Sequence, residues 1–259
     1  MSDAAQLHPL NLESEQYGTP EGIGENISYA FSLGLPELSP SLCLNDGTFV
    51  IVGSGPTVKE YVEEIREEAK TRPICAVKGA YDFLVENDIK PTFFVSVEPR
   101  FREILHPQKE SIFLIASRCD PETFKQVEGY NVILWNAWGS EDENPFVKGH
   151  IALGGGPTSG LRALSIGYIL GFRKFNFYGM DSCLIEGEKR IGQGEIHNDV
   201  QTIDVIVGGR SFLCTMAMAD QAQNFQEIYE FIDDITIHSF GDGLISAILA
   251  ERRKQGLRA

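Results

Sequence analysis

The hydrophobic positions of the chain follow two alternating patterns. Short runs rich in β-branched and aromatic residues have the composition of strands buried on both faces of a sheet. Between them lie segments in which apolar residues recur every three or four positions, as they do on one face of a helix. The first five runs after residue 47 are TFVIVG, PICAVK, TFFVSV, SIFLIAS and NVILWN. This alternation predicts an α/β fold with a Rossmann-like, mostly parallel sheet and helices on both faces.

The segments between these strands differ in how clearly they predict helices. PTVKEYVEEIREEAK and GAYDFLVENDI follow the first two strands and have the clearest helical period. We expect a short helix near Arg102 after the third strand, and another over DPETFKQV after the fourth. After the fifth strand, NAWGSEDENPFVKGH has the length and polarity of a lid or substrate loop.

The second half of the chain continues the alternation and adds a hairpin. Nearly every residue of 161–170 is apolar, which predicts a central helix, and the strand KFNFYGMD follows it. Two apolar runs flank Gly208 and Gly209, which predicts a β-hairpin insertion near the C-terminal part. The remaining expected elements are a helix over 217–231, the strand ITIHSF and a helix over 244–254.

Composition divides the chain into two parts. Residues 1–44 are rich in Gly, Pro and Ser and predict an N-terminal lead-in with a short helix around 27–33. Residues 45–259 predict a single Rossmann-like α/β domain, since this length suits one such unit. The lead-in could pack over the domain or help it to assemble, so the sequence leaves a homo-oligomer open.

Charge and cysteine content restrict the partners and the compartment. The formal net charge is −15, which argues against a general nucleic-acid or membrane-surface binder, because both need a positive footprint. The five cysteines form no C-x-x-C and no zinc pattern, so we expect reduced thiols, no metal site and a cytoplasmic location. The N-terminus is too polar for a secretory signal, and no apolar run reaches the length of a membrane span.

A first glycine turn directly follows the first strand. Gly53, Ser54, Gly55, Pro56 and Thr57 lead into a helix, and the free amides of a helix start favour an anion. The position of the third glycine of G-x-G-x-x-G holds Val58, and no G-x-x-x-x-G-K-[ST] is present, so neither a standard dinucleotide site nor a P-loop is expected. The alternative is an ordinary tight turn of an α/β protein.

A second glycine turn, GGGPTSG over 154–160, precedes the apolar helix. Its glycines, including Gly155 and Gly156, would let the backbone approach a ligand closely. Pro157 can start the helix, and Thr158 and Ser159, before Gly160, add hydroxyls beside the free amides. The alternative is a tight entry into a buried helix that needs glycine for packing.

Other polar residues occur where the predicted strands end. In a parallel sheet these ends share one edge, where ligands of open α/β proteins bind. Helix caps and surface turns are the alternative roles, above all for Ser117 and Asn136. Trp135 and Trp138 flank Asn136 and could stack on a base or a sugar, although core packing is the safer interpretation. The polar residues at the strand ends are Lys78, Glu98, Ser117, Arg118, Asn136 and Asp181.

Two residues are candidates for catalysis. Asp181 ends a strand, where a carboxylate can take a metal, a sugar hydroxyl or a proton, or can simply cap the next turn. His197 lies in a polar, glycine-rich loop, and an imidazole there titrates near neutrality as a general base requires. A lone loop histidine is more often only solvated. His238, on an apparently buried strand, is expected to be structural.

Four stretches of the chain carry a resemblance to a known family: VIVGSGPTV, AVKGAYDFLVENDIKPTFFVSVEP, GGGPTSGLRALSIGYILGFRKFNFYGMD and MAMADQAQNF. Together they resemble the 6-hydroxymethylpterin diphosphokinase MptE-like family, which includes motility accessory factor glycosyltransferases thought to modify flagellin. The resemblance covers about residues 48–225 and implies the Rossmann-like fold more specifically than it implies a reaction.

The same elements are similar to single-domain bacterial sialyltransferases, in which GNGPS and a later TSG bind the nucleotide of a CMP-sugar. Residues 53–57 match the first motif, with Ser54 in place of the usual Asn, and residues 158–160 match the second. The GMD ending at Asp181 resembles their GID. Those enzymes take a base from the following loop, where His197 lies here, although the residues around it do not match closely.

The resemblance therefore allows more than one function. Pterin kinases of the family have a turn like TDLDG after the third strand, whereas this chain has SVEPR. That departure favours a glycosyltransferase, sialyltransferase-like or motility accessory factor-like, that moves a sugar from a CMP-sugar type of donor to a hydroxyl acceptor. No cofactor is expected to bind tightly. The alternatives are an MptE-like pyrophosphokinase using ATP and magnesium on 6-hydroxymethylpterin, and a non-catalytic nucleotide or sugar binder.

Overall fold

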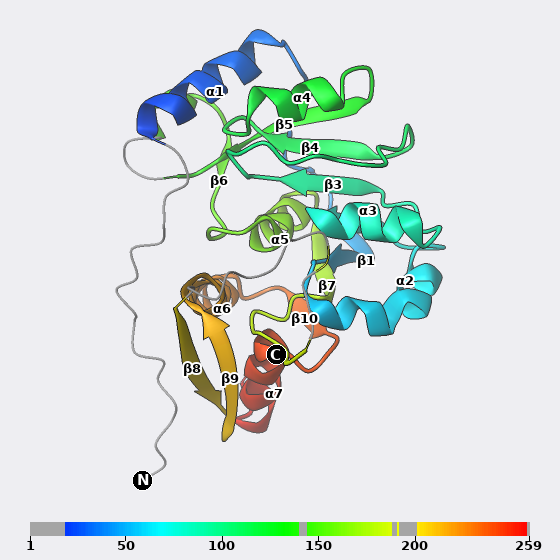
Figure 1. Ribbon diagram of the computed structural model, residues 1–259, viewed down its shortest axis with the longest axis vertical. Coiled ribbons are helices and arrows are strands. Elements are labelled where there is room, and N and C mark those ends of the chain that lie inside the picture. Colours follow the sequence, from blue (N-terminus) through cyan, green and yellow to red (C-terminus); the bar gives the residue numbers. More distant parts are fainter. Residues whose placement is uncertain (1–18, 140–143, 188–190, 192–200, 258–259) are drawn as a thin grey trace.

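The chain folds around one parallel β-sheet. The computed structural model describes residues 19–139, 144–187, 191 and 201–257. The strands lie in the order β10-β7-β1-β2-β3-β4-β5-β6, and every neighbouring pair is parallel (Figure 1). The predicted fold class is therefore confirmed. The strands are β1 (Asn45–Val52), β2 (Ile74–Val77), β3 (Phe93–Ser96), β4 (Ile112–Ala116), β5 (Asn131–Ala137), β6 (Ala152–Leu153), β7 (Phe172–Tyr178) and β10 (Thr236–Ser239).

Helices cover both faces of this sheet. Phe93 and Phe94 are successive residues of β3, so their side chains point to opposite faces. Phe93 packs against Phe49 on the face covered by the apolar helix α5, whereas Phe94 packs against Tyr81 of α3. The α-helices are α1 (Pro20–Ser32), α2 (Val62–Glu68), α3 (Gly79–Glu86), α4 (Pro121–Gln126), α5 (Ser159–Ile169), α6 (Met216–Phe231) and α7 (Leu244–Lys254).

Helix α5 carries the chain across the sheet. It leaves β6 at one edge and packs against β1, β2, β3 and β7 before the chain enters β7 on the far side of β1. Its central position explains why the sequence is apolar nearly all round: most of its side chains are buried. Gly167 permits this contact, because a Cβ there would come within 2.9 Å of the Phe49 ring.

Two local expectations were wrong in detail. No helix forms near Arg102, and 97–111 is irregular, since Pro99 and Pro107 both lack the amide that a helix interior needs. The helix expected to begin at Pro56 begins there as a 3-10 helix, η1 (Pro56–Tyr61), and becomes α-helical only at Val62.

The lead-in contains a longer helix than expected. Helix α1 begins at Pro20, where the Thr19 hydroxyl accepts a hydrogen bond from the Gly22 amide at 3.2 Å. It packs beside α4, and Asn26 donates from Nδ2 to the Arg118 carbonyl at 3.1 Å. The lead-in is thereby joined to the edge of the sheet at which β4 ends.

The predicted hairpin is confirmed. Strands β8 (Thr202–Val207) and β9 (Arg210–Thr215) pair antiparallel and form a separate two-stranded sheet. Gly208 and Gly209 have φ values of 58° and 79°, the positive values that a tight two-residue hairpin turn requires at both positions. Within the described ranges, no helix is long and apolar enough to cross a membrane.

Candidate functional site

The parallel sheet brings the predicted polar residues to one edge. Gly53 follows β1, Lys78 follows β2 and Ser117 follows β4. Glu98 lies two residues beyond β3, Asn136 is the penultimate residue of β5, and Asp181 lies three residues beyond β7. Since all these strands point the same way, their ends form a single carboxyl edge, where open α/β proteins bind ligands. His197 lies outside the described residues.

The first glycine turn packs against the end of β7. The Gly53 amide donates to the Tyr178 carbonyl and the Gly55 amide to the Gly179 carbonyl, both at 2.8 Å. A Cβ on Gly53 would lie 2.5 Å from the Gly179 oxygen, so glycine is required for the close approach of two backbones. The Gly55 amide was expected to hold a phosphate, but it donates its hydrogen bond to the Gly179 carbonyl.

An internal carboxylate occupies the start of the first helix. Asp181, whose side chain is only 3% exposed, accepts from the Thr57 amide at 3.1 Å and from the Thr57 hydroxyl at 2.5 Å. The anion that the helix start favours is therefore supplied by the chain itself. Asp181 thus caps a helix start that lies 124 positions earlier in the chain, whereas the sequence suggested a cap on the turn that directly follows it.

The second glycine turn is held in a conformation that only glycine adopts readily. Gly155 and Gly156 have φ values of 130° and 77°. A Cβ on Gly155 would collide with the Ser165 hydroxyl, and one on Gly156 would lie 3.1 Å from the Asn224 Cβ. The loop is thus packed tightly against both α5 and α6.

Thr158 fixes where α5 begins. It is the N-cap residue, and its hydroxyl accepts from the Leu161 amide at 3.4 Å and from Gln221 Nε2 on α6 at 3.1 Å. Pro157 consequently precedes the cap, whereas the sequence suggested that it could start the helix. The amides of Ser159 and Gly160 have no acceptor within the helix.

Ser159 holds an unused buried donor at the same place. Its side chain is 1% exposed, and within the described residues no partner lies within hydrogen-bond distance of its Oγ. Buried hydroxyls are nearly always hydrogen-bonded, so an unpaired one needs an explanation. Together with the two helix-start amides, this hydroxyl forms a set of donors suited to an anion.

The two glycine turns share a neighbour. The Met180 Sδ would lie 2.7 Å from a Cβ on Gly160 and 3.0 Å from a Cβ on Gly53. Both turns therefore meet around one side chain at the end of β7, on the same edge of the sheet.

Arg162 was not identified from the sequence. It lies on α5, one turn after Ser159, and is 7% exposed. Its guanidinium donates to the Trp138 carbonyl at 2.9 Å and also to the Leu153 carbonyl, and so ties the ends of β5 and β6 to α5. Its positive charge beneath the helix start adds to the attraction for an anion. The sequence feature that could have identified Arg162 is that it is a charged residue in a helix whose other residues are mostly apolar.

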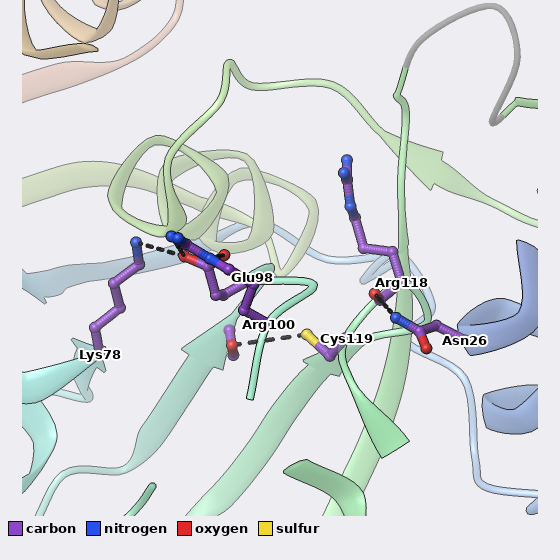
Figure 2. Close-up of polar contacts among 7 residues, drawn as sticks. Asn26, Lys78, Glu98, Arg100, Arg118 and Cys119 are labelled. Carbon is purple, nitrogen blue, oxygen red and sulfur yellow. Dashed lines mark hydrogen bonds and ion pairs between the residues drawn. The ribbon is translucent and has the colours of Figure 1, made fainter. Parts of the chain in front are cut away.

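Lys78, Glu98 and Arg100 form a second polar group on the edge (Figure 2). Glu98 is 5% exposed, with Lys78 Nζ 3.5 Å from its Oε2 and Arg100 Nε 3.0 Å from its Oε1. Burial raises the pKa of Glu98, but the Arg100 hydrogen bond and the charges of Lys78, Arg100 and Arg102 outweigh it and hold that pKa below its ordinary value. Glu98 is thus an ionised, paired carboxylate.

The remaining predicted residues have structural partners. The Ser117 amide donates to the Trp135 carbonyl at 2.8 Å, and Asn136 Nδ2 donates to Glu37 at 3.2 Å. Trp135 is buried and its Nε1 donates to the Leu114 carbonyl, so it belongs to the core. Trp138, in contrast, is 57% exposed at the end of β5, where an aromatic face can meet a ligand.

A separate hollow lies away from the carboxyl edge. It measures about 490 Å³, and its lining comes from β1, α2, β7 and β10 and the residues just beyond them. His238 lines this hollow and is exposed, so the expectation of a buried strand position was wrong. Strand β10 is the outermost strand of the sheet in the part of the chain that the structure describes.

A family model and solved structures are similar to this chain. A family model described as 6-hydroxymethylpterin diphosphokinase MptE-like matches residues 25–187. Among solved structures, the MAf glycosyltransferase from Magnetospirillum magneticum AMB-1 aligns with a TM-score of 0.65 at 16% identity. The alignment covers 86% of this chain and 37% of that chain, so this chain spans little more than a third of that protein. A mammalian sialyltransferase aligns with a TM-score of 0.47 at 12% identity, over 86% of this chain and 81% of that chain. No curated protein matches the sequence.

Proposed function

The chain belongs to the 6-hydroxymethylpterin diphosphokinase MptE-like family, and on that premise we propose that it is a nucleotide-sugar-dependent glycosyltransferase. The proposed reaction moves a sugar from a CMP-sugar type of donor to a hydroxyl acceptor. The fold that the chain shares with a bacterial glycosyltransferase is consistent with this chemistry but does not specify it.

The observation that carries the proposal is the unsatisfied start of α5. Within the described residues, the Ser159 hydroxyl has no hydrogen-bond partner. The amides of Ser159 and Gly160 are at the start of α5, where a helix provides no acceptor for them. The loop before them is held in a glycine-only conformation that brings the backbone to the edge. Donors fixed before the ligand arrives are what stabilises a leaving phosphate.

Each step of the transfer has a proposed group. The α5 donors would bind the phosphate that leaves the sugar, and the cations Arg162, on the same helix, and Lys78, on the same edge of the sheet, would stabilise its growing charge. A base must take the proton from the acceptor hydroxyl, and His197 remains proposed for it. Asp181 is the alternative base, but its carboxylate already accepts two hydrogen bonds from Thr57.

The diphosphokinase reaction is the second candidate, because the family description names it. It would need paired carboxylates to hold magnesium, and the sequence offers Glu98 and Asp181 at the ends of the predicted strands. Glu98 pairs with Lys78 and Arg100, and Asp181 caps η1, so each would have to give up these partners to bind a metal. For this reason we propose glycosyl transfer ahead of the diphosphokinase reaction.

A ligand-binding panel tests the proposed site. We expect CMP, UDP or GDP, or one of their sugars, to bind with a micromolar to millimolar Kd in calorimetry, and Ser159→Ala to weaken that binding about tenfold. Ser211→Ala is the matched control, since Ser211 lies on the β8–β9 hairpin and bonds only to Asp204 in the described structure. Equal affinity of wild type and Ser159→Ala would remove the α5 start from the site.

Metal dependence separates the two enzyme classes. We expect EDTA to leave nucleotide binding largely intact, because the proposed donors are amides, a hydroxyl and cations. A strict requirement for magnesium, with ATP as the preferred ligand, would reverse the ranking in favour of the diphosphokinase. A non-catalytic binder would bind the nucleotide sugar but release no nucleotide from it.

A further inference from the structure

A second buried hydroxyl lies at the carboxyl edge, outside the set of donors at the α5 start. Ser182 follows Asp181 directly, four residues beyond the end of β7, and its side chain is 7% exposed. In the part of the chain that the structure describes, its Oγ has no hydrogen-bond partner. Buried hydroxyls nearly always have one, so the partner of Ser182 is either a bound water or a ligand.

The backbone of Ser182 favours the ligand over the water. Its φ is 51°, in the left-handed region that residues other than glycine adopt only rarely. Gly179, three residues earlier in the same turn, has a φ of 61°, so the chain uses glycine for this conformation close by. Strain of this kind is concentrated at functional sites. A serine where glycine would fit more easily indicates that the hydroxyl has a use.

Two other elements hold the main chain around Ser182 in place. The Asp181 carbonyl accepts a hydrogen bond from the Leu244 amide at the start of α7, at 2.7 Å. The Ser182 carbonyl accepts from Cys214 Sγ on β9 at 3.3 Å. The strained conformation is thus enforced by neighbours and does not need a ligand to form. A group that is fixed before a ligand arrives binds it at a lower entropic cost.

Met180 shows that Ser182 lies close to the α5 start. The Met180 Sδ would lie 2.7 Å from a Cβ on Gly160, so this side chain contacts the first turn of α5. Two residues of chain span at most about 7 Å, which keeps Ser182 near that contact. Rotation about χ1 alone is enough to redirect a serine hydroxyl. A sugar bonded to a phosphate at Ser159 is therefore within reach of Ser182.

We propose that the Ser182 hydroxyl binds the sugar of the donor, while the α5 start binds the phosphate. This inference rests on the proposed function, in which the α5 start takes the leaving phosphate. A serine hydroxyl both donates and accepts, and so do the hydroxyls of a sugar, whereas an ionised phosphate oxygen only accepts. Ser182 is then a binding residue that distinguishes a nucleotide sugar from the free nucleotide.

The test compares each nucleotide with its sugar by calorimetry on the full chain. The pairs are CMP and CMP-sialic acid, UDP and UDP-N-acetylglucosamine, and GDP and GDP-mannose. For the donor that binds, we expect Ser182→Ala to weaken binding of the nucleotide sugar about fivefold and to change the affinity for the nucleotide alone less than about twofold. Ser159→Ala should weaken both, because it acts on the phosphate that the two ligands share.

The stability of the ligand-free chain separates this role from a structural one. Ser182→Gly removes the hydroxyl and suits the left-handed backbone, so its melting temperature should be equal to or above that of the wild type. It should still weaken binding of the nucleotide sugar as much as Ser182→Ala does. Asp88→Gly is the matched control: Asp88 has a φ of 57° but lies between α3 and β3, at the opposite edge of the sheet, and should leave every affinity unchanged.

Two results would overturn this inference and leave the proposed function standing. Both Ser182 variants could bind the nucleotide sugar as tightly as the wild type while Ser159→Ala does not, which would assign the hydroxyl to a bound water. The Ser182 variants could instead lose affinity equally for the nucleotide and its sugar, which would contradict a contact with the sugar. If the wild type binds none of the nucleotides or nucleotide sugars, the proposed function and this inference fail together.

Discussion

At the scale of single residues, the two buried carboxylates at the carboxyl edge both have partners within the protein. Asp181 and Glu98 both follow strands, and the sequence offered them the same roles. Asp181 holds Thr57, whereas Glu98 holds two cations. The sequence could not distinguish them, because Thr57 and Asp181 are 124 positions apart and only the pairing of β1 with β7 brings them together.

Asp181→Asn tests the capping role. The amide side chain would lose the charge that favours both hydrogen bonds from Thr57, and we expect the free energy of unfolding to fall by roughly 1–3 kcal/mol. Thermal and urea denaturation measure this loss. Asp242→Asn, which weakens only an exposed pair with Arg210, is the control and should change little. An unchanged melting temperature for Asp181→Asn would contradict the assignment.

Glu98→Gln makes a prediction about pH. The pKa of Glu98 in the folded chain is below the ordinary value of 4.5, so its ionised form stabilises the fold above about pH 4.5. That stabilisation is lost as the pH falls from there through the folded pKa. The difference in unfolding free energy between wild type and Glu98→Gln should therefore be largest near pH 7 and shrink below pH 4.5. A difference independent of pH would show that Glu98 is not held as an ion pair.

At the scale of elements, the two glycine turns have different roles despite similar sequences. The first leads into a 3-10 helix whose start is filled by Asp181, and the second leads into α5, whose start still holds an unpaired hydroxyl. The sequence predicted the strand, turn and helix in both places, because the period at which apolar residues recur indicates which face of an element is buried. It could not report which start is occupied, because the occupant comes from a distant part of the chain.

Two helices of the chain begin at a threonine N-cap, and comparing their variants separates an effect on stability from an effect on nucleotide binding. Thr158→Ala removes the cap of α5 and the contact with Gln221, and Thr215→Ala removes the cap of α6. Each should lower the unfolding free energy by about 1 kcal/mol. In calorimetry only Thr158→Ala should also weaken nucleotide binding. If the two variants weakened binding equally, the effect would come from general stability and not from the α5 start.

At the scale of the whole molecule, the single parallel sheet is what gathers the site. Residues as far apart in sequence as Lys78 and Asp181 share an edge because every strand between them points the same way. The alternation of apolar runs and helical periods was enough to predict this edge. Arg100 lies two residues after Glu98, so the sequence already suggested that these two could pair, and the structure shows that pair. Nothing in the spacing indicated that Lys78 joins them or that the carboxylate is buried.

The extent of the chain also matters at this scale. It aligns with 37% of the Magnetospirillum glycosyltransferase, so the comparison concerns the shared fold and leaves most of that protein without a counterpart here. The acceptor of the proposed reaction is therefore the part of the account that the shared fold informs least, and the donor is the part that can be measured directly.

Release of nucleotide from a nucleotide sugar is that measurement. The chain would be incubated with CMP-sialic acid, UDP-N-acetylglucosamine and GDP-mannose in EDTA, with water as the acceptor of the sugar, and free nucleotide would be quantified by chromatography over time. We predict release from one of these donors, reduced roughly a hundredfold by Ser159→Ala, the usual effect of removing one donor to a developing charge, and unaffected by Ser211→Ala. No release from any of the three donors, together with formation of AMP from ATP, magnesium and 6-hydroxymethylpterin, would contradict the account.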